Sequence, residues 1–334
     1  MDYLKRAHSL ARLGLTNTSP NPHVGAVVVA PDGRVIGEGY HRKCGEAHAE
    51  VNAIASVAPE DRHLLDRSTI YVTLEPCSHY GKTPPCSKLI IDTHIPHVVV
   101  GVGDPNPKVN GRGINMLREA GVDVELAGGI RYVMCKNADP KFMSRFINNR
   151  PYITLKWAQS ADGYMAQGDG CPVALSTPLT STLVHKLRAE HDVILTSAAT
   201  VAADNPRMDS RLWKAGKNPV KVIVDRSGKT PSDAVILKER ETIVLNCDIS
   251  EAVDEIYARG YNSILVEAGP ALLSEFIRKG LYDAIRIETA SGITLGENGA
   301  KKAPVLPKDV FRSKVREYDG NLIEFYLKKN NSGE

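Results

Sequence analysis

His48-Ala49-Glu50 opens a predicted helix, and residues 73–86, which read TLEPCSHYGKTPPC, begin at the end of a predicted strand. The first stretch combines an imidazole with a carboxylate, and the second contains two thiols nine positions apart. The chain has six cysteines in total. In a cytoplasmic protein, close-set cysteines near a histidine indicate metal ligands rather than disulfides.

Zinc accepts imidazole and thiolate ligands in a tetrahedron, and a catalytic site leaves one position open for water. His48, Cys77 and Cys86 would supply three ligands, and Glu50 would move protons between this water and the substrate. Positions i and i+2 do not share a helix face, so His48 and Glu50 can converge only if His48 lies at the helix start. We expect both cysteines to lie near helix starts as well.

These residues also allow interpretations other than a catalytic zinc site. A His-x-Glu sequence often occurs by chance, and two cysteines that flank Pro84-Pro85 could simply pack in a core. A structural zinc site would normally have a fourth ligand, and none is evident, although His79 is close in sequence. The combination of a helix-opening His-Ala-Glu, a strand followed by Glu-Pro-Cys and a second cysteine before another helix favours catalysis.

The apolar pattern of the first half predicts alternating helices and strands. Helices are expected near 2–14, 48–57, 87–94 and 114–120, and strands near 24–29, 34–40, 69–74, 97–102 and 122–126. The turn Pro31-Asp32-Gly33 joins the first two strands into a hairpin. This order predicts a three-layer α/β/α domain, with helices on both faces of a mixed sheet.

Residues 128–150 form a polar join, and a second α/β pattern follows it. Strands are expected near 152–158, 192–196, 220–224, 263–266, 283–289 and 322–328, and helices near 178–190 and 271–278. The turn at Gly269-Pro270 lies between a strand and a helix whose first amides could hold a phosphate, although a strand–turn–helix without a ligand fits equally well. The Rossmann glycine fingerprint is absent. We expect two domains, 1–146 and 147–334.

The composition limits the class of protein. The 334 residues are 42% hydrophobic and 24% charged, with a net charge of +3. No apolar run approaches the roughly 20 residues of a membrane span, and the N-terminus lacks the pattern of a signal peptide. Neither half is strongly basic, so nucleic acid is not an expected partner. We expect a cytoplasmic enzyme that acts on a small molecule, with no membrane partner.

The zinc motif closely resembles the deaminase half of the bifunctional riboflavin-biosynthesis deaminase–reductases. The loops at 21–25, 39–41, 104–107 and 111–113 share this resemblance, and the nine-position cysteine step separates the family from tRNA adenosine deaminases and cytidine deaminases. The resemblance implies a cytidine-deaminase-like fold and a substrate, 2,5-diamino-6-(5-phosphoribosylamino)pyrimidin-4(3H)-one. It also implies site residues: zinc on His48, Cys77 and Cys86, proton transfer by Glu50, and substrate contacts from Asn21, His41 and Asn106.

The second half resembles the reductase half of the same family through residues 155–156, 160–163, 187–189, 200–208, 223–225 and 266–270. This resemblance implies a dihydrofolate-reductase-like α/β fold and NADPH-dependent reduction of the ribosyl group to ribityl, giving 5-amino-6-(5-phosphoribitylamino)uracil. Ala158, Thr200, Asp204 and Gly269 match cofactor contacts. Substrate contacts are implied for Lys156, Arg188, Met208, Arg211 and Glu267. Arg188 and Arg211 could chelate the substrate phosphate.

One segment departs from the family. Near residues 168–182 the family carries a tryptophan and an arginine that this chain lacks. An alternative is therefore a deaminase whose C-terminal domain is non-catalytic or altered in specificity. A nucleic-acid-editing deaminase is disfavoured by the charge balance and by the 6% aromatic content. The resemblance also implies a homo-oligomer, either a dimer or a tetramer.

Overall fold

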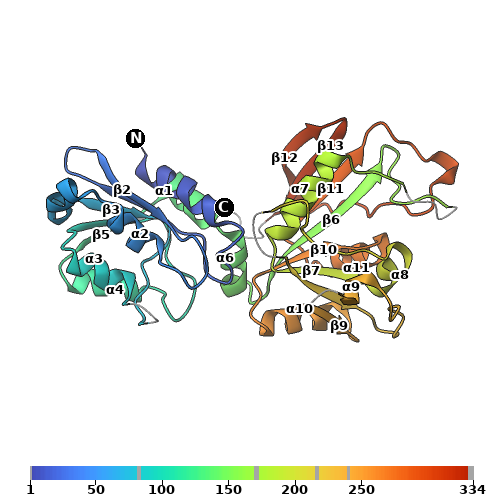
Figure 1. Ribbon diagram of the computed structural model, residues 1–334, viewed down its shortest axis with the longest axis horizontal. Coiled ribbons are helices and arrows are strands. Elements are labelled where there is room, and N and C mark those ends of the chain that lie inside the picture. The colour runs from blue at the N-terminus through green and yellow to red at the C-terminus, as the bar shows by residue number, and fades with distance from the viewer. Residues whose placement is uncertain (1, 81–83, 169–172, 215–217, 239–240, 330–334) are drawn as a thin grey trace. The chain divides into compact units, whose positions relative to one another are not determined.

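The computed structural model describes residues 2–80, 84–168, 173–214, 218–238 and 241–329. It divides into two compact units, residues 1–149 and 150–334, which are coloured blue to green and green to red in Figure 1. Each unit has its own apolar core. In the parts of the chain that are described, no helix is long and apolar enough to cross a membrane.

The first unit is built on a five-stranded mixed sheet. In the order β2-β1-β3-β4-β5, the strands are Val35–Tyr40, Gly25–Val29, Thr69–Val72, His97–Val100 and Asp123–Leu126. Strand β1 is antiparallel to β2 and β3, whereas β3, β4 and β5 are parallel. The central strands are rich in buried valine and isoleucine, as expected for a sheet covered on both faces. The predicted hairpin and mixed sheet are confirmed.

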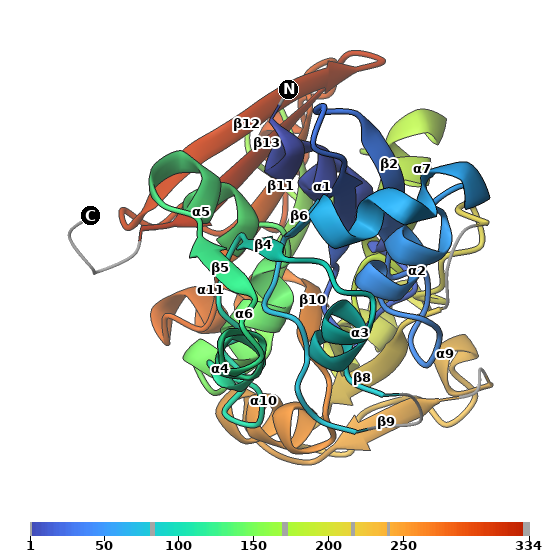
Figure 2. The same ribbon diagram turned by 90° about the vertical axis from the view of Figure 1, so that its left-hand side faces the viewer.

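Helices cover both faces of this sheet, which confirms the three-layer prediction. Helices α1 (Tyr3–Ala11) and α5 (Gly129–Lys136) lie on one face, where Ala7 and Leu10 pack on alternate residues of β1. The other face carries α2 (Ala49–Ala55), α3 (Cys86–Asp92) and α4 (Arg112–Glu119), and α3 and α4 lie side by side (Figure 2). Short 3-10 helices occupy Arg12–Gly14 and Pro59–Arg67.

Residues 128–150 were expected to be a polar linker without helices. This prediction is wrong, because the segment contains α5 and a further helix, α6 (Pro140–Ile147). The start of α6 carries a recognisable signal. Asp139 is its N-cap and accepts a hydrogen bond from the amide of Phe142, and proline occupies the first helical position. Helix α5 has no comparable cap, and its apolar residues Ile130 and Val133 are exposed, so neither a cap nor a buried face marked this helix.

Gly39 sets the position of α2, and therefore of the predicted zinc ligand before it. A Cβ at Gly39 would lie 2.3 Å from the Ala53 nitrogen and 2.5 Å from the Ala49 oxygen. Real Cβ atoms are not found at such distances from backbone atoms. Only glycine lets the first turn of α2 lie directly on β2, and this close approach holds His48 and Glu50 against the sheet.

The second unit contains an eight-stranded sheet in the order β12-β13-β11-β6-β10-β7-β8-β9. The strands from β11 to β9 are parallel, and the β12–β13 hairpin, red in Figure 1, extends the sheet beyond β11 in antiparallel fashion. In chain order from β6 to β13 the strands are Tyr152–Ser160, Val193–Ser197, Val220–Val224, Thr242–Leu245, Ser263–Glu267, Ala284–Ala290, Val310–Tyr318 and Asn321–Lys328.

Among the described residues of this unit, five α-helices accompany the sheet. They are α7 (Pro178–Ala189), α8 (Ala198–Asp204), α9 (Val235–Lys238), α10 (Ile249–Ala258) and α11 (Pro270–Arg278), and a short 3-10 helix occupies Gly296–Asn298. All eight elements predicted here are present. Helices α8, α9 and α10 and strands β9 and β12 were not predicted from the sequence. Helix α10 could have been found, because Asp248 and Glu251 form a capping box at its start.

Candidate functional site

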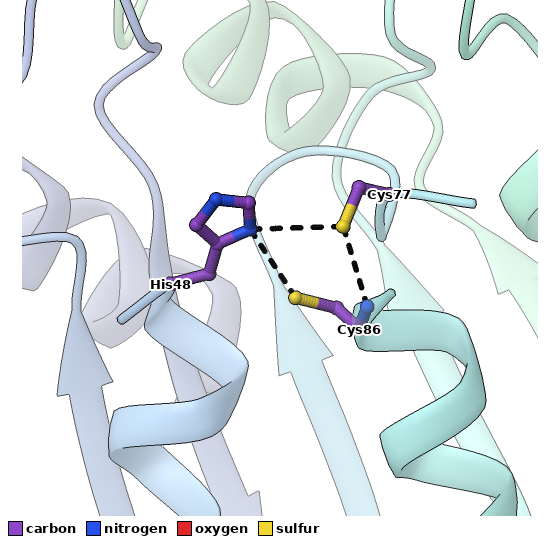
Figure 3. A group of neighbouring side chains, drawn as sticks. All are labelled: His48, Cys77 and Cys86. Atoms are coloured by element: carbon purple, nitrogen blue, oxygen red, sulfur yellow. Dashed lines mark hydrogen bonds between the residues drawn. The ribbon is translucent and has the colours of Figure 1, made fainter. Parts of the chain in front are cut away.

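His48, Cys77 and Cys86 converge at one end of the first sheet, as Figure 3 shows. Their ligand atoms all lie within 4.8 Å of one another. The Nδ1 atom of His48 is 3.7 Å from the Cys77 sulfur and 3.3 Å from the Cys86 sulfur. Two separate stretches of the sequence therefore direct their three metal-ligand atoms at a single position.

This arrangement fits zinc. Zinc bonds of about 2.0–2.3 Å in a tetrahedron place the ligand atoms roughly 3.3–3.8 Å apart. The nitrogen–sulfur distances of 3.3 and 3.7 Å are close to that range. In the described residues, this is the one group of at least three His, Cys, Asp or Glu side chains arranged to hold a metal ion. One imidazole and two thiolates, without a fourth protein ligand among the described residues, are typical of a catalytic zinc site.

Local structure explains how each ligand is positioned. His48 is the N-cap of α2 with an extended backbone (φ −71°, ψ 169°), so it lies at the helix start, as the spacing required. Cys86 is the first residue of α3 and follows Pro85. The expectation that Cys77 also lies at a helix start is wrong, because it lies in the loop after β3. Its carbonyl instead accepts hydrogen bonds from the amide and the hydroxyl of Ser87.

The two thiols are electrostatically unequal. The amide of Cys86 donates to the Cys77 sulfur at 3.3 Å. Hydrogen bonding from the Cys86 thiol, against the effect of burial, lowers the pKa of Cys77 to about 4. The same hydrogen bond raises the pKa of Cys86. The lowered pKa favours the thiolate form of Cys77, which is the form that binds a metal ion.

Glu50 lies beside this group in the first turn of α2, and only 3% of its surface is exposed. Burial raises the pKa of Glu50 to about 7, although the neighbouring His48 ring acts in the opposite direction. The Glu50 carboxyl group interacts with the Cys86 thiol, which places it directly against the metal-type residues. A buried carboxyl group with a raised pKa beside metal-type residues is suited to general acid–base chemistry.

His41 and Asn21, both predicted substrate contacts, pair with each other beside the metal-type group. His41 Nδ1 donates to the Ala47 carbonyl at 3.0 Å, so its Nε2 accepts from the Asn21 amide at 3.2 Å. The His41 ring packs edge-on against His48, with ring centroids 5.3 Å apart. Burial lowers the pKa of His41, which favours this neutral form.

Asn106, the third predicted substrate contact in this unit, lies in a turn formed by residues 104–108. Its amide donates to Asp104 Oδ1, and its own side-chain oxygen accepts from the amide of Lys108. The turn is tied to the zinc loop, because the amide of Asp104 donates to Glu75 at 3.2 Å. The sequence analysis quoted Glu75 within the motif but assigned it no role.

Removal of one thiol tests the metal centre. Cys86→Ser should weaken zinc binding by more than about 100-fold, because loss of a single outer partner of a zinc ligand already costs 10–100-fold. The measurement is zinc content and affinity by chelator competition. The exposed Cys44→Ser is the matched control and should retain full zinc. Equal zinc affinity in both variants would exclude Cys86 as a ligand.

In the second unit, three predicted substrate residues form one buried charge cluster. Arg188 Nε donates to Glu267 Oε1 at 2.8 Å and Nη2 to Oε2 at 3.0 Å, and Lys156 Nζ lies 3.8 Å from Oε2. Burial would raise the pKa of Glu267, but Arg188 and Lys156 outweigh burial and lower it to about 2. Burial lowers the pKa of Lys156 despite Glu267.

The other two predicted substrate residues flank this cluster. Met208 Sδ lies 3.9 Å from Arg188 Nη2, and Arg188 Nη1 donates to the carbonyl of Asp209. Arg211 is exposed and pairs with the Asp209 carboxylate. Arg188 already uses four of its five N–H donors within the protein, counting the weak contact of Nη2 with the Met208 sulfur. A substrate phosphate would therefore contact Arg211 and only those N–H groups of Arg188 that are not already paired within the protein.

The charge cluster continues across the sheet through residues that were not predicted from the sequence. Arg286 lies in register with Lys156 on the neighbouring strand and pairs with Glu288 at 3.5 Å. Glu288 also accepts from the side-chain amide of Asn321 at 2.8 Å. A signal was present: two charged residues alternate with isoleucines in a strand that is otherwise buried.

Two of the four predicted cofactor residues, Thr200 and Gly269, are in contact with each other. Thr200 Oγ1 accepts from the amide of Gly269 at 3.1 Å, which links the start of α8 to the start of α11. Ala158 lies on β6, and Asp204 is exposed at the end of α8. Gly269 is the N-cap of α11, as the strand–turn–helix pattern predicted. In the segment that departs from the family, residues 169–172 lie outside the described residues.

Comparison with known proteins identifies the class. Residues 1–102 match the cytidine and deoxycytidylate deaminase zinc-binding region, and residues 151–313 match the RibD C-terminal domain. Together with the His48–Cys77–Cys86 group and the two sheets, these matches define a zinc-binding deaminase domain with a cytidine-deaminase-like fold, joined to a dihydrofolate-reductase-like reductase domain.

Relatives span nearly the whole chain. The riboflavin biosynthesis protein RibD of Aquifex aeolicus is 34% identical over 354 residues, covering 97% of each chain. That of Bacillus amyloliquefaciens is 37% identical over 311 residues, covering 85% of this chain and 82% of the relative. The crystal structure of a diaminohydroxyphosphoribosylaminopyrimidine deaminase/5-amino-6-(5-phosphoribosylamino)uracil reductase from Thermotoga maritima matches with a TM-score of 0.87 at 33% identity, covering 98% and 97%. The chain belongs to the RibD family, and it is a bifunctional deaminase and reductase of riboflavin biosynthesis.

Proposed function

We propose that the first unit deaminates 2,5-diamino-6-(5-phosphoribosylamino)pyrimidin-4(3H)-one by hydrolysis, and that the second unit then reduces the ribosyl group with NADPH to give 5-amino-6-(5-phosphoribitylamino)uracil. The observation that carries the proposal is the convergence of His48, Cys77 and Cys86 beside the buried carboxyl group of Glu50. The names of the two activities on the Thermotoga maritima relative support the choice of substrate.

In the deamination, His48, Cys77 and Cys86 would hold Zn²⁺, which when bound acidifies water so that hydroxide is available near neutral pH. Glu50 would take a proton from water and deliver it to the ring nitrogen, and it would then take a second proton from the new hydroxyl group and deliver it to the amino group that leaves as ammonia. Neutral His41 and Asn21 would exchange their mutual hydrogen bond for contacts with the substrate. Asn106 would contact the substrate from the turn at 104–108.

In the reduction, Thr200, Gly269, Ala158 and Asp204 would contact NADPH. Because the Gly269 amide already donates to Thr200 Oγ1 and Pro270 has no N–H, a phosphate group would meet the later amides of the first turn of α11. Lys156, Arg188, Met208, Arg211 and Glu267 would contact the substrate. Lys156 is the group best suited to proton movement, because burial lowers its pKa and so makes its ammonium group a better proton donor. The ion pair between Arg188 and Glu267 would fix the walls of the site.

Further assignments belong to the same proposal. Deamination is assigned to residues 1–146 and reduction to residues 147–334. The enzyme would work in the cytoplasm as a homo-oligomer, either a dimer or a tetramer. Sedimentation of the purified chain measures this state directly, and a monomer at micromolar concentration would contradict it.

Product masses test the two activities in one experiment. Incubation with the diaminopyrimidine phosphate alone should replace one amino group by oxygen, with release of ammonia. Addition of NADPH should further add two hydrogens to the product. Ammonia release without the second change would support the alternative of a non-catalytic C-terminal domain. Absence of ammonia release from this substrate would contradict the proposed deamination.

A further inference from the structure

Glu75, two residues before the zinc ligand Cys77, is buried to 4% exposure and accepts four backbone hydrogen bonds. Its Oε2 accepts from the amides of Asp104 at 3.2 Å and Gly111 at 2.9 Å. Its Oε1 accepts from the amides of Gly113 at 2.9 Å and Ile114 at 3.3 Å. Hydrogen bonds of amides to a carboxylate are about twice as strong as those between neutral groups.

The four donors all belong to one segment, residues 104–114. It begins with the turn that holds Asn106 and ends in the first turn of α4, where a carboxylate is favoured by the helix dipole. Glu75 therefore joins the loop that carries a zinc ligand to the loop that carries a predicted substrate contact.

The packing around this junction is tight. A Cβ at Gly113 would lie 1.9 Å from the Pro76 carbonyl oxygen and 3.3 Å from Glu75 Oε1. The backbone of Glu75 is also fixed, because its amide donates to the Val102 carbonyl at 2.9 Å. On its other side, Cys77 is held by Ser87 and by the amide of Cys86. The loop 75–77 is thus clamped between the segment 104–114 and the start of α3.

We propose that Glu75 is a positioning residue that sets the Cys77 thiolate and the 104–114 segment in a single geometry, so that zinc affinity and substrate binding depend on the same carboxylate. For zinc, the inference rests on the metal-type group alone. For substrate, it rests on the proposed function, because Asn106 is assigned to the substrate only there.

Glu75→Gln tests this role, because glutamine keeps the size but directs an NH₂ group at two of the four donors. In the zinc-free full-length protein, amide hydrogen exchange at Gly111, Gly113 and Ile114 should accelerate by about tenfold or more. Zinc should bind about 10–100-fold more weakly by chelator competition. At zinc concentrations that restore full occupancy, KM for the diaminopyrimidine phosphate should remain raised about tenfold while kcat changes less.

The matched control is Glu119→Gln, which removes an exposed carboxylate from the same unit and should leave all three measurements unchanged. A local role requires that amides in α1 and β1 keep their protection, so uniform acceleration of exchange would overturn the proposal. Unchanged zinc affinity and unchanged exchange in Glu75→Gln would overturn it as well. Both measurements need no substrate, so they stand even if the proposed substrate is wrong.

A second variant covers the case in which Glu75→Gln does not fold. Glu75→Asp keeps the charge but is one methylene too short to reach both pairs of donors, so it should give the same changes at smaller size. Normal zinc affinity and normal exchange in Glu75→Asp would overturn the proposal. Unfolding of both variants would also overturn it, since Glu75 would then serve the fold as a whole.

Discussion

Glu50→Gln should slow ammonia release by about 10²–10⁴-fold, the usual contribution of a general acid–base group, while zinc stays bound. Glutamine fills the same volume in the first turn of α2 and cannot take up or release a proton at neutral pH. Because His48, Cys77 and Cys86 are unchanged, the metal centre should be retained. The measurements are ammonia release under saturating substrate and zinc content of the same sample.

The control for this variant is Glu46→Gln, an exposed carboxylate in the loop before α2. It should retain full ammonia release. The reductase half supplies an internal check, because Glu50→Gln should reduce the deaminated intermediate with NADPH at the normal rate. Ammonia release within a few-fold of normal, with zinc present, would show that another group moves the proton.

The deaminase site could be predicted from the sequence because its chemistry is concentrated in two short stretches. His48 and Glu50 are separated by one residue, and the two cysteines flank a single loop. The hairpin and the alternation of strands and helices then required these stretches to meet at one end of a sheet. The role of Glu75 was not predictable in this way, since its four partners are backbone amides nearly 30 to 40 positions further along the chain.

The reductase half was less predictable because its site is assembled from single residues on many elements. Glu267, Lys156 and Arg286 are neighbours only through the register of three parallel strands. Strand β12 was missed because nearly all of its side chains are exposed, so it shows no alternation of buried and exposed residues. Resemblance to the family supplied Arg188 and Glu267, but it did not indicate that they bind each other.

Glu267→Gln should destabilise the second unit by about 3–5 kcal/mol, because it leaves two largely buried cations, Arg188 and Lys156, without their counter-charge. NADPH-dependent reduction should be lost, whereas ammonia release should persist. Trp157 and Trp213 are the only two tryptophans of the chain and both lie in the second unit. Tryptophan fluorescence therefore follows the unfolding of this unit separately, with a fall in Tm of roughly 6–20 °C.

The pH dependence of unfolding gives this prediction a second measurement. Because the pKa of Glu267 is lowered to about 2 from its ordinary value of 4.5, its stabilising contribution is complete above pH 4.5 and is lost as the pH falls toward 2. The normal protein should lose about 3 kcal/mol over this window from Glu267 alone. Glu267→Gln should lack that component, so the two proteins should converge in stability at low pH.

Glu255→Gln is the matched control, because it breaks an ion pair with Arg259 that lies on the surface of the same unit. Such exposed pairs contribute at most about 1 kcal/mol. Adding Arg188→Met to Glu267→Gln should recover part of the lost stability without restoring reduction, since it removes one of the uncompensated cations. If Glu267→Gln and Glu255→Gln shift the fluorescence transition equally, Glu267 does not hold the cluster together, and the cations must be stabilised by Glu288 and the Asp209 carbonyl instead.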